Sequence, residues 1–258
     1  MDFEALLREG TSLDVEAFWG AGFLADRYRP GGVSWDWGAE LRPLLGTADR
    51  MLDMGTGEGG VLAALAPLPP VTVAYEEWAP TIPAAVRTLR PLGVHLVRAL
   101  GSVDNVSANP APSRRGLPFT DGAFDLVIDR HEAFDPAEVG RITRSGGTFV
   151  TQQVGGDEAA SVRALFDLPL DQPAWDADVA TAQLAAAGWR VDDVREERVL
   201  SQFTDIAALI GYVRSTPWAY ADLDLAAALP RLSQLHDQSR VRPIGAVTHR
   251  FLIRATAA

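Results

Sequence analysis

The chain has 258 residues, a formal net charge of −11 at pH 7 and no cysteine. The lack of cysteine excludes disulfides, thiolate nucleophiles and iron–sulfur clusters. All 23 basic residues are arginine, which excludes a Schiff base on lysine and a phosphate-binding loop that depends on lysine. The acidic balance argues against a nucleic-acid partner, because phosphate contacts need clustered basic residues.

The composition is that of an ordinary globular domain. Hydrophobic residues make up 47% of the chain and charged residues 22%. No apolar run approaches the roughly 18 residues of a membrane span. The first residues, Met1-Asp-Phe-Glu, lack the basic and apolar pattern of an export signal. We therefore expect a single cytoplasmic domain with no membrane partner.

Apolar spacing and breaker residues predict helices and strands that alternate along the chain. Helices are predicted within 1–30 and at Trp35–Leu45, Gly60–Leu65, Ile82–Leu92, Pro136–Ile142, Val179–Ala187 and Ile206–Arg214. Strands are predicted at Met51–Met54, Val71–Tyr75, Val94–Leu100, Phe124–Ile128, Thr148–Val154, Arg190–Val199 and Arg250–Ala255. Residues 215–242 form an insertion before the last strand. Such alternation with short connections indicates an α/β fold with a parallel, doubly wound sheet.

The most informative segment follows the first predicted strand. It reads Arg50-Met-Leu-Asp-Met-Gly-Thr-Gly-Glu-Gly-Gly60 and leads into an apolar helix. Glycines at 55, 57 and 59 allow backbone conformations closed to other residues and let a ligand approach the main chain. The helix start behind them offers unpaired N–H groups. The segment therefore predicts a nucleotide-type binding site.

Two ligand classes compete for this turn. Gly55, Gly57 and Gly60 match the G-x-G-x-x-G pattern, in which a helix N-terminus holds the pyrophosphate of a dinucleotide. A lone match to that pattern is weak, and the negative charge of Asp53 would repel a pyrophosphate. Asp53 suits a ligand that is cationic there, such as S-adenosylmethionine with its ammonium and sulfonium groups. A turn that binds no ligand is the third interpretation.

Three segments resemble the class I S-adenosylmethionine-dependent methyltransferases of the small-molecule type. They are the glycine motif Leu52–Gly59, the stretch Leu117–Val127 that leads into the fourth strand, and the run Glu138–Val150 into the fifth. Their order and spacing carry the resemblance, which covers roughly residues 35–155. It implies a seven-stranded, mostly parallel sheet whose last two strands form an antiparallel edge.

The resemblance also implies an organisation within one methyltransferase domain, 1–258. We expect an N-terminal helical lid at 1–34, a cofactor-binding core at 35–158 and a substrate-side half at 159–258 that contains the insertion 215–242. A monomer and a homodimer are both open.

Several positions in these motifs are candidate cofactor contacts. Glu76 ends the second strand, where an acid can accept hydrogen bonds from both ribose hydroxyls. Trp78 can stack on adenine or cover the sheet edge. In the family, the loop after the third strand contacts adenine, which points to Asp104 and Asn105. The full set predicted to bind S-adenosylmethionine is Asp53, Gly55, Thr56, Gly57, Glu76, Trp78, Asp104, Asn105, Asp129 and Arg130.

The end of the fourth strand carries the candidate catalytic residues. Ligands of open α/β sheets lie beyond the carboxyl ends of the strands. His131 is the candidate general base, because an unperturbed imidazole titrates near neutrality, and Glu132 is expected to orient it. A structural histidine or a contact to the cofactor are the alternatives. The predicted substrate contacts are Trp19, Tyr28, Gln152, Gln153, Tyr212 and Trp218. No metal is expected, because glutamines stand where related metal-dependent enzymes need carboxylates.

The sequence thus predicts methyl transfer from S-adenosylmethionine to a nitrogen, oxygen or carbon of a small molecule, with S-adenosylhomocysteine as product. A secondary metabolite is a plausible acceptor. An RNA methyltransferase and an inactive S-adenosylmethionine-binding regulator are the alternatives. An NAD(P)-dependent oxidoreductase is the rival from another class, but it would need a catalytic tyrosine and lysine or an equivalent pair.

Overall fold

The computed structural model describes residues 2–14, 22–102, 105, 116–169 and 175–258. Two compact units share the chain. The sheet unit comprises Val33–Gly155, Gln172–Glu197 and Arg250–Ala258. The helical unit comprises Met1–Gly32, Gly156–Asp171 and Arg198–His249. The boundaries of these two units differ from those of the predicted lid, core and substrate-side half. The functional roles of those three parts stay a prediction.

Five parallel strands form the centre of the sheet unit: β2 (Arg50–Met54), β3 (Val71–Glu76), β4 (His95–Arg98), β5 (Phe124–Arg130) and β6 (Thr143–Val154). Strand β2 pairs with β3 on one side and with β5 on the other. Strands β4 and β6 extend the parallel sheet beyond β3 and β5. The carboxyl ends of all five strands therefore meet at one edge.

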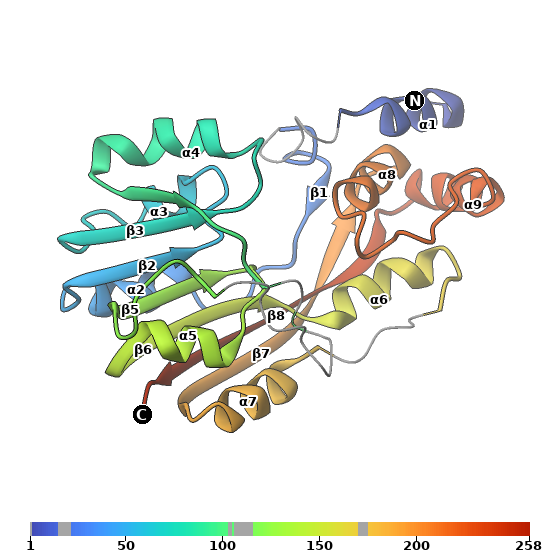
Figure 1. The fold of residues 1–258 in the computed structure, drawn as a ribbon. Helices are drawn as coiled ribbons and strands as arrows, with labels where there is room; N and C mark the ends of the chain where they lie inside the picture. Colours follow the sequence, from blue (N-terminus) through green and yellow to red (C-terminus); the bar gives the residue numbers. More distant parts are fainter. Residues whose placement is uncertain (1, 15–21, 103–104, 106–115, 170–174) are drawn as a thin grey trace. The chain divides into compact units, whose positions relative to one another are not determined.

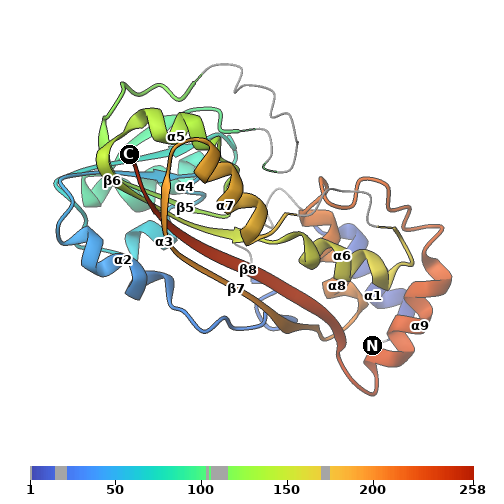
Figure 2. The ribbon, with the colours of Figure 1, turned by 90° about the horizontal axis from the view of Figure 1, so that it is seen from below.

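The last strand, β8 (Ile244–Thr256), runs antiparallel to β6 and lies between β6 and β7 (Arg190–Phe203). The residues of each of these long strands are divided between the two units: 190–197 of β7 and 250–256 of β8 belong to the sheet unit, and 198–203 and 244–249 to the helical unit. Strands β7 and β8 are neighbours in the sheet, as Figure 2 shows.

The α/β class is confirmed, but the sheet has eight strands in the described residues rather than the expected seven. The strand order is β1-β7-β8-β6-β5-β2-β3-β4. The additional strand, β1 (Tyr28–Arg29), has two residues and pairs antiparallel with Gln202 and Phe203 of β7. Two residues are too few to produce an alternating hydrophobic pattern, so periodicity could not reveal this strand.

Helices cover both faces of the sheet unit. On one face, α2 (Trp37–Leu45), α3 (Gly60–Ala63) and α4 (Ile82–Leu89) pack against strand residues such as Met51 and Leu126. On the other face, α5 (Pro136–Ile142) and α7 (Ala177–Ala186) pack against their strand neighbours Leu52 and Val127. In Figure 1, α4 lies at the top of the view of this unit, and α5 and α7 lie toward its bottom. Adjacent strand residues thus face opposite hydrophobic layers, as a doubly wound sheet requires.

The helical unit contains α1 (Phe3–Ser12), α6 (Gly156–Leu165), α8 (Ile206–Ser215) and α9 (Leu229–Ser239). Its apolar core includes Leu6, Val162, Ile210 and Leu235, one from each helix. Helices α1 and α8 approach so closely that a Cβ on Gly10 would lie 2.9 Å from the Cβ of Ile210. None of the helices in the described ranges combines the length and apolar character that a membrane crossing requires.

Aspartates set where many helices begin. A side-chain oxygen of the residue before the first turn accepts a backbone N–H, which satisfies a donor that the helix itself leaves free. The capping residues are Asp2 for α1, Asp36 for α2, Asp135 for α5, Asp176 for α7 and Asp205 for α8. These local signals explain why the predicted starts of α5 and α8 agree with the structure.

Candidate functional site

The glycine turn follows β2 directly, and its three glycines have left-handed backbone angles. The φ angles are 61° at Gly55, 58° at Gly57 and 80° at Gly59. Gly59 packs against α4, because a Cβ there would lie 2.6 Å from the Cγ of Leu89. No atom lies within 4 Å of a Cβ placed on Gly57. Gly59 is therefore needed for packing, whereas Gly57 leaves open space beside the main chain.

This difference predicts unequal effects of two alanine substitutions. Gly59→Ala combines left-handed strain with a collision against Leu89, and we expect it to lower the free energy of unfolding by roughly 2–4 kcal/mol. Gly57→Ala carries the strain alone and should cost about 1 kcal/mol. Urea unfolding of both variants measures the difference. Equal losses would show that the helix–turn contact has no energetic weight.

Buried carboxylates surround this turn at the ends of three adjacent strands. Asp53 of β2 is 7% exposed, Glu76 of β3 is 5% exposed and Asp129 of β5 is fully buried. Burial, with a contribution from Glu76, raises the pKa of Asp53 to about 7. Burial and the nearby charges of Glu132 and Asp53 raise the pKa of Asp129 well above its ordinary value. None of these carboxylates forms an ion pair with a described residue.

Glu76 ties the glycine turn to the end of β3. Its Oε2 accepts the backbone N–H of Gly57 at 2.6 Å, and its Oε1 accepts that of Trp78 at 2.7 Å. Each carboxylate oxygen can accept a further hydrogen bond. Trp78 keeps 49% of its surface exposed, so its ring has no fixed place in the core.

The Glu132 side chain lies against the glycine turn. A Cβ on Gly55 would collide with it, and one on Gly101 would lie 2.7 Å from its Oε1. Burial and the charges of Glu77 and Glu76 raise the pKa of Glu132 to about 8. The sequence predicts that Glu132 orients the His131 ring. Among the hydrogen bonds of the described residues, the partner of that ring is Gln152 instead. The local reason is that the Glu132 N–H donates to Asp129 Oδ1 at 3.0 Å, which turns the chain after β5.

His131 follows β5 with a left-handed φ of 73°. Its backbone N–H donates to the carbonyl of Gln152 at 2.9 Å, and its Nε2 lies 3.0 Å from the Nε2 of Gln152. The residue as a whole is exposed, but desolvation by the surrounding protein, together with the charges of Arg130 and Arg250, lowers the pKa of its imidazole well below the usual value. A left-handed conformation is uncommon for a residue with a side chain and marks a functional candidate.

Gln152 and Gln153 are both buried, with 5% and 2% of their surfaces exposed. Gln152 accepts the indole N–H of Trp35 at 2.9 Å. The Gln153 amide nitrogen lies 2.9 Å from the Glu132 carbonyl and 3.2 Å from Asp129 Oδ2. These side chains are thus tied to other protein groups, and their predicted contact with a substrate stays a prediction.

Asn105 is likewise held by protein partners. Its Nδ2 donates to the Gln153 Oε1 at 3.2 Å, and its Oδ1 accepts the N–H of Phe134 at 2.8 Å. The predicted contact of Asn105 with adenine stays a prediction. Asp104 and Trp19 lie outside the described residues.

The other predicted substrate residues belong to the helical unit. Tyr28 stacks on Phe203 with ring centroids 4.7 Å apart and lies 5.1 Å from the ring of Tyr212. The Tyr212 hydroxyl donates to Glu158 at 2.7 Å. Trp218 is 65% exposed. Tyr28 and Tyr212 therefore contribute to packing within their own unit.

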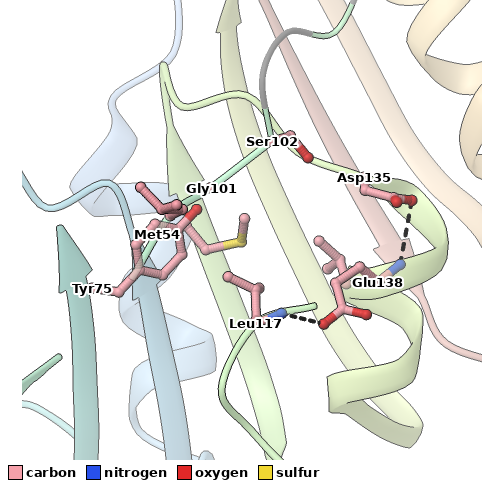
Figure 3. A pocket seen from close by; sticks show the side chains of 9 residues that line it. Met54, Tyr75, Gly101, Ser102, Leu117, Asp135 and Glu138 are labelled. Carbon is pink, nitrogen blue, oxygen red and sulfur yellow. Dashed lines mark hydrogen bonds between the residues drawn. The ribbon is translucent and has the colours of Figure 1, made fainter. Parts of the chain in front are cut away.

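Sequence reasoning missed two residues of the site, Tyr75 and Trp35. The Tyr75 hydroxyl is buried without a hydrogen-bond partner among the described residues. Figure 3 shows its ring beside Met54 and Gly101 at the edge of a cavity. A tyrosine inside an apolar strand reads as core packing, so no sequence signal distinguishes it. Trp35 precedes the cap of α2, and only the fold brings it to Gln152.

The cavity beside Tyr75 holds about 240 Å³ of space that is partly open to solvent. Only about 10 Å³ of it can hold the centre of a water molecule, so this cavity is far smaller than the roughly 300–1,000 Å³ of typical ligand pockets. Hydrogen bonds close its far side, where Glu138 accepts the N–H of Leu117 at 2.6 Å (Figure 3). In the parts of the chain that the structure describes, no three acidic or histidine side chains are grouped to hold a metal ion. The expectation of no metal stays a prediction.

Comparison with solved structures identifies proteins with a similar fold. The chain is similar to the YcgJ protein from Bacillus subtilis, with a TM-score of 0.58 and 16% identity over 85% of this chain and 97% of that one. It is similar to a candidate methyltransferase from Bacillus halodurans C-125, with a TM-score of 0.58 and 16% identity over 86% of this chain and 98% of that one. A protein from Deinococcus radiodurans R1 gives a TM-score of 0.53 at 15% identity, with 90% and 91% of the two chains covered.

No protein-family model and no curated protein sequence matches the chain. The structural likeness, at these low identities, defines the fold. It is the fold of the class I S-adenosylmethionine-dependent methyltransferases, as the three sequence motifs implied.

Proposed function

We propose that this protein is a methyltransferase that uses S-adenosylmethionine to methylate a small molecule. The observation that carries the proposal is the group of buried carboxylates around the glycine turn. Asp53, Asp129 and Glu132 have raised pKa values, chiefly because burial penalises their charged forms. The charge of Arg130 partly offsets that of Asp53, but burying several acids together is unfavourable unless a further cation joins them.

S-adenosylmethionine matches this demand, since it carries a positive sulfonium and an ammonium group. A dinucleotide would bring an anionic pyrophosphate to the same carboxylates, where like charges repel. The charge of the site thus favours the sulfonium nucleoside over NAD or NADP.

The residues at the turn fit this cofactor. The Thr56 hydroxyl is buried near the Asp53 carboxylate and forms no hydrogen bond of good geometry with a described residue, so a polar ligand would satisfy it. The space beside Gly57 is open, and both oxygens of Glu76 can accept further hydrogen bonds. We propose that Asp53, Thr56, Gly57, Glu76 and Asp129 hold the cofactor, with Gly55, Trp78, Asn105, Asp104 and Arg130 as further contacts.

The bound cofactor would supply a methyl group that its positive sulfur already activates. The protein's contribution is then mainly to orient the acceptor, and such positioning can lower a barrier by about 7–11 kcal/mol. We propose that His131 and Glu132 border the reacting groups after β5. Trp19, Tyr28, Gln152, Gln153, Tyr212 and Trp218 remain the proposed acceptor contacts.

The acceptor is proposed to be a small molecule because the net charge of −11 disfavours an RNA backbone. A cytoplasmic location is part of the proposal. The alternatives are an RNA methyltransferase and a regulator that binds the cofactor without turnover. A screen of methyl acceptors, carried out after the binding test, distinguishes both from the proposed function.

A thermal-shift panel with S-adenosylmethionine, S-adenosylhomocysteine, NAD and NADP tests the proposed ligand class. A ligand at about 100 times its Kd should add roughly 2.7 kcal/mol of stability. For a protein of this size, that corresponds to a rise in Tm of several degrees. Stabilisation by the two sulfur nucleosides alone supports the proposal. Stabilisation by NAD or NADP alone contradicts it.

The raised pKa values also predict that cofactor affinity depends on pH. A cation binds the ionised forms of Asp53 and Glu132, whose pKa values are about 7 and about 8 without ligand. Binding at acidic pH must therefore release protons, so the affinity should increase as pH rises from about 5.5 to about 7.5. The limit is roughly tenfold per pH unit for each proton released.

Titration calorimetry at several pH values measures this dependence. S-adenosylhomocysteine is the matched control ligand, because it lacks the sulfonium charge and should show a shallower slope. An affinity for S-adenosylmethionine that is independent of pH would contradict the role assigned to these carboxylates.

A further inference from the structure

The side chains of Trp35, Gln152 and His131 form a chain of hydrogen bonds in the sheet unit. The Trp35 indole nitrogen lies 2.9 Å from Gln152 Oε1, and the Gln152 amide nitrogen lies 3.0 Å from His131 Nε2. Trp35 and Gln152 are 6% and 5% exposed, so water does not compete strongly for these groups. The chemistry of the donors and acceptors fixes which group donates in each of these two hydrogen bonds.

The first donor is Trp35. An indole N–H can only donate a hydrogen bond. The amide atom of Gln152 that faces it must therefore be the oxygen, and the amide NH₂ group must face His131. This removes the usual ambiguity in assigning the two ends of a glutamine side chain.

The same logic applies at the second contact. An amide NH₂ group only donates, so His131 Nε2 must accept and cannot carry a proton. The charges of Arg130 and Arg250 and the surrounding protein disfavour the doubly protonated, positive ring. A neutral imidazole without a proton at Nε2 carries its proton at Nδ1.

We infer that Trp35 and Gln152 are positioning residues that hold His131 as the neutral tautomer protonated at Nδ1, so that it offers a ligand a hydrogen-bond donor rather than a base. The backbone supports this arrangement, since the His131 N–H also donates to the Gln152 carbonyl. Gln152 thus holds both the ring and the left-handed backbone of His131. None of the hydrogen bonds among the described residues uses Nδ1, and the residue is exposed.

The tautomer has a consequence for substrate class, which rests on the proposed function. With the Nε2 lone pair occupied, His131 does not remove a proton from a hydroxyl acceptor. It selects instead an acceptor with a lone pair that can receive the Nδ1–H, such as a carbonyl, an ether or a neutral amine. This inference replaces the general-base role that the sequence predicts for His131.

Long-range ¹H–¹⁵N spectra of protein labelled at histidine nitrogen report the tautomer directly. The chain has four histidines, and the His131→Asn variant assigns the signal of interest. We expect His131 in the wild-type protein near pH 7 to show a protonated Nδ1 and an unprotonated Nε2. A protonated Nε2 would overturn the inference.

Two variants test the origin of the tautomer. Trp35→Phe removes the indole donor, so the Gln152 amide can rotate and both tautomers should be populated. Trp37→Phe is the matched control, because the buried Trp37 indole nitrogen has no hydrogen-bond partner among the described residues, and it should leave the tautomer unchanged. An unchanged tautomer in Trp35→Phe would contradict the positioning role.

Gln152→Glu provides an independent check if Trp35→Phe unfolds. A carboxylate there would accept from a protonated Nε2, so the tautomer should reverse and the pKa of His131 should rise by about one unit or more. Retention of the Nδ1–H form would again contradict the inference. These spectra need no cofactor, so a failure of S-adenosylmethionine to bind would overturn the proposed function while leaving the tautomer result intact.

Discussion

Replacing Asp53 with asparagine is expected to weaken S-adenosylmethionine binding by about 10–100-fold, which corresponds to roughly 1.4–2.7 kcal/mol. The substitution removes a negative charge from a buried position at the glycine turn while keeping the size of the side chain. Titration calorimetry of both proteins at pH 7.5 measures the loss. Unchanged affinity would show that Asp53 does not face the cation.

The same variant should be more stable than the wild type when no ligand is present at about pH 8. The folded-state pKa of Asp53, about 7, lies above the ordinary value of 3.8. The group therefore contributes stability that is fully present below pH 3.8 and is lost as pH rises through about 7. Asparagine cannot ionise and avoids this loss, so we expect a gain on the order of 1–3 kcal/mol.

Asp49→Asn is the matched control for Asp53→Asn. It makes the same chemical change at an exposed residue that directly precedes the same strand, β2. Neither affinity nor stability should change by more than about 0.5 kcal/mol. Urea unfolding at pH 5 and pH 8 gives the stability comparison. A loss of stability for Asp53→Asn at pH 8 would contradict the desolvation that the structure implies.

Glu76→Ala is expected to be the most damaging single substitution at the site. It removes the acceptor for the backbone N–H groups of Gly57 and Trp78, and it leaves a void at a residue that is 5% exposed. Unsatisfied buried donors cost about 1–3 kcal/mol each, so stability should fall by roughly 2–5 kcal/mol. Cofactor affinity should fall by at least about tenfold, because the ribose would also lose its acceptor.

Glu77→Ala is the natural control for this experiment, since Glu77 is the adjacent acid and is exposed. It accepts only the backbone N–H of Gly101, at 3.0 Å, among the hydrogen bonds of the described residues. We expect a stability loss below about 1 kcal/mol and little change in affinity. Similar effects of Glu76→Ala and Glu77→Ala would contradict the placement of Glu76 as the link between the turn and β3.

The parts of the fold with local causes could be predicted from the sequence. Helix α5 has the predicted bounds because Asp135 caps it and Pro136 starts it. The glycine turn was predicted because its left-handed angles need glycine. Strand β6 begins at Thr143, five residues before the predicted Thr148, because pairing with β5 continues across an irregularity that local patterns do not encode.

The candidate site shows the same division. Asp53, Glu76 and Asp129 were predicted because strand ends meet at one edge of a parallel sheet. The place of Glu132 against Gly55 depends on how the chain turns after β5, and the contact of Trp35 with Gln152 joins residues that are 117 positions apart. Such contacts follow from the packed fold, so the sequence could suggest His131 but not its hydrogen-bond partners.

The most direct test of the account is a calorimetric titration of the purified protein with S-adenosylmethionine, repeated with the Asp53→Asn variant. The account predicts one binding site per chain in the wild type and a loss of affinity in the variant. Absence of binding to the wild type, or equal affinity in both proteins, would contradict the central claim that buried carboxylates beside the glycine turn receive a cationic nucleoside.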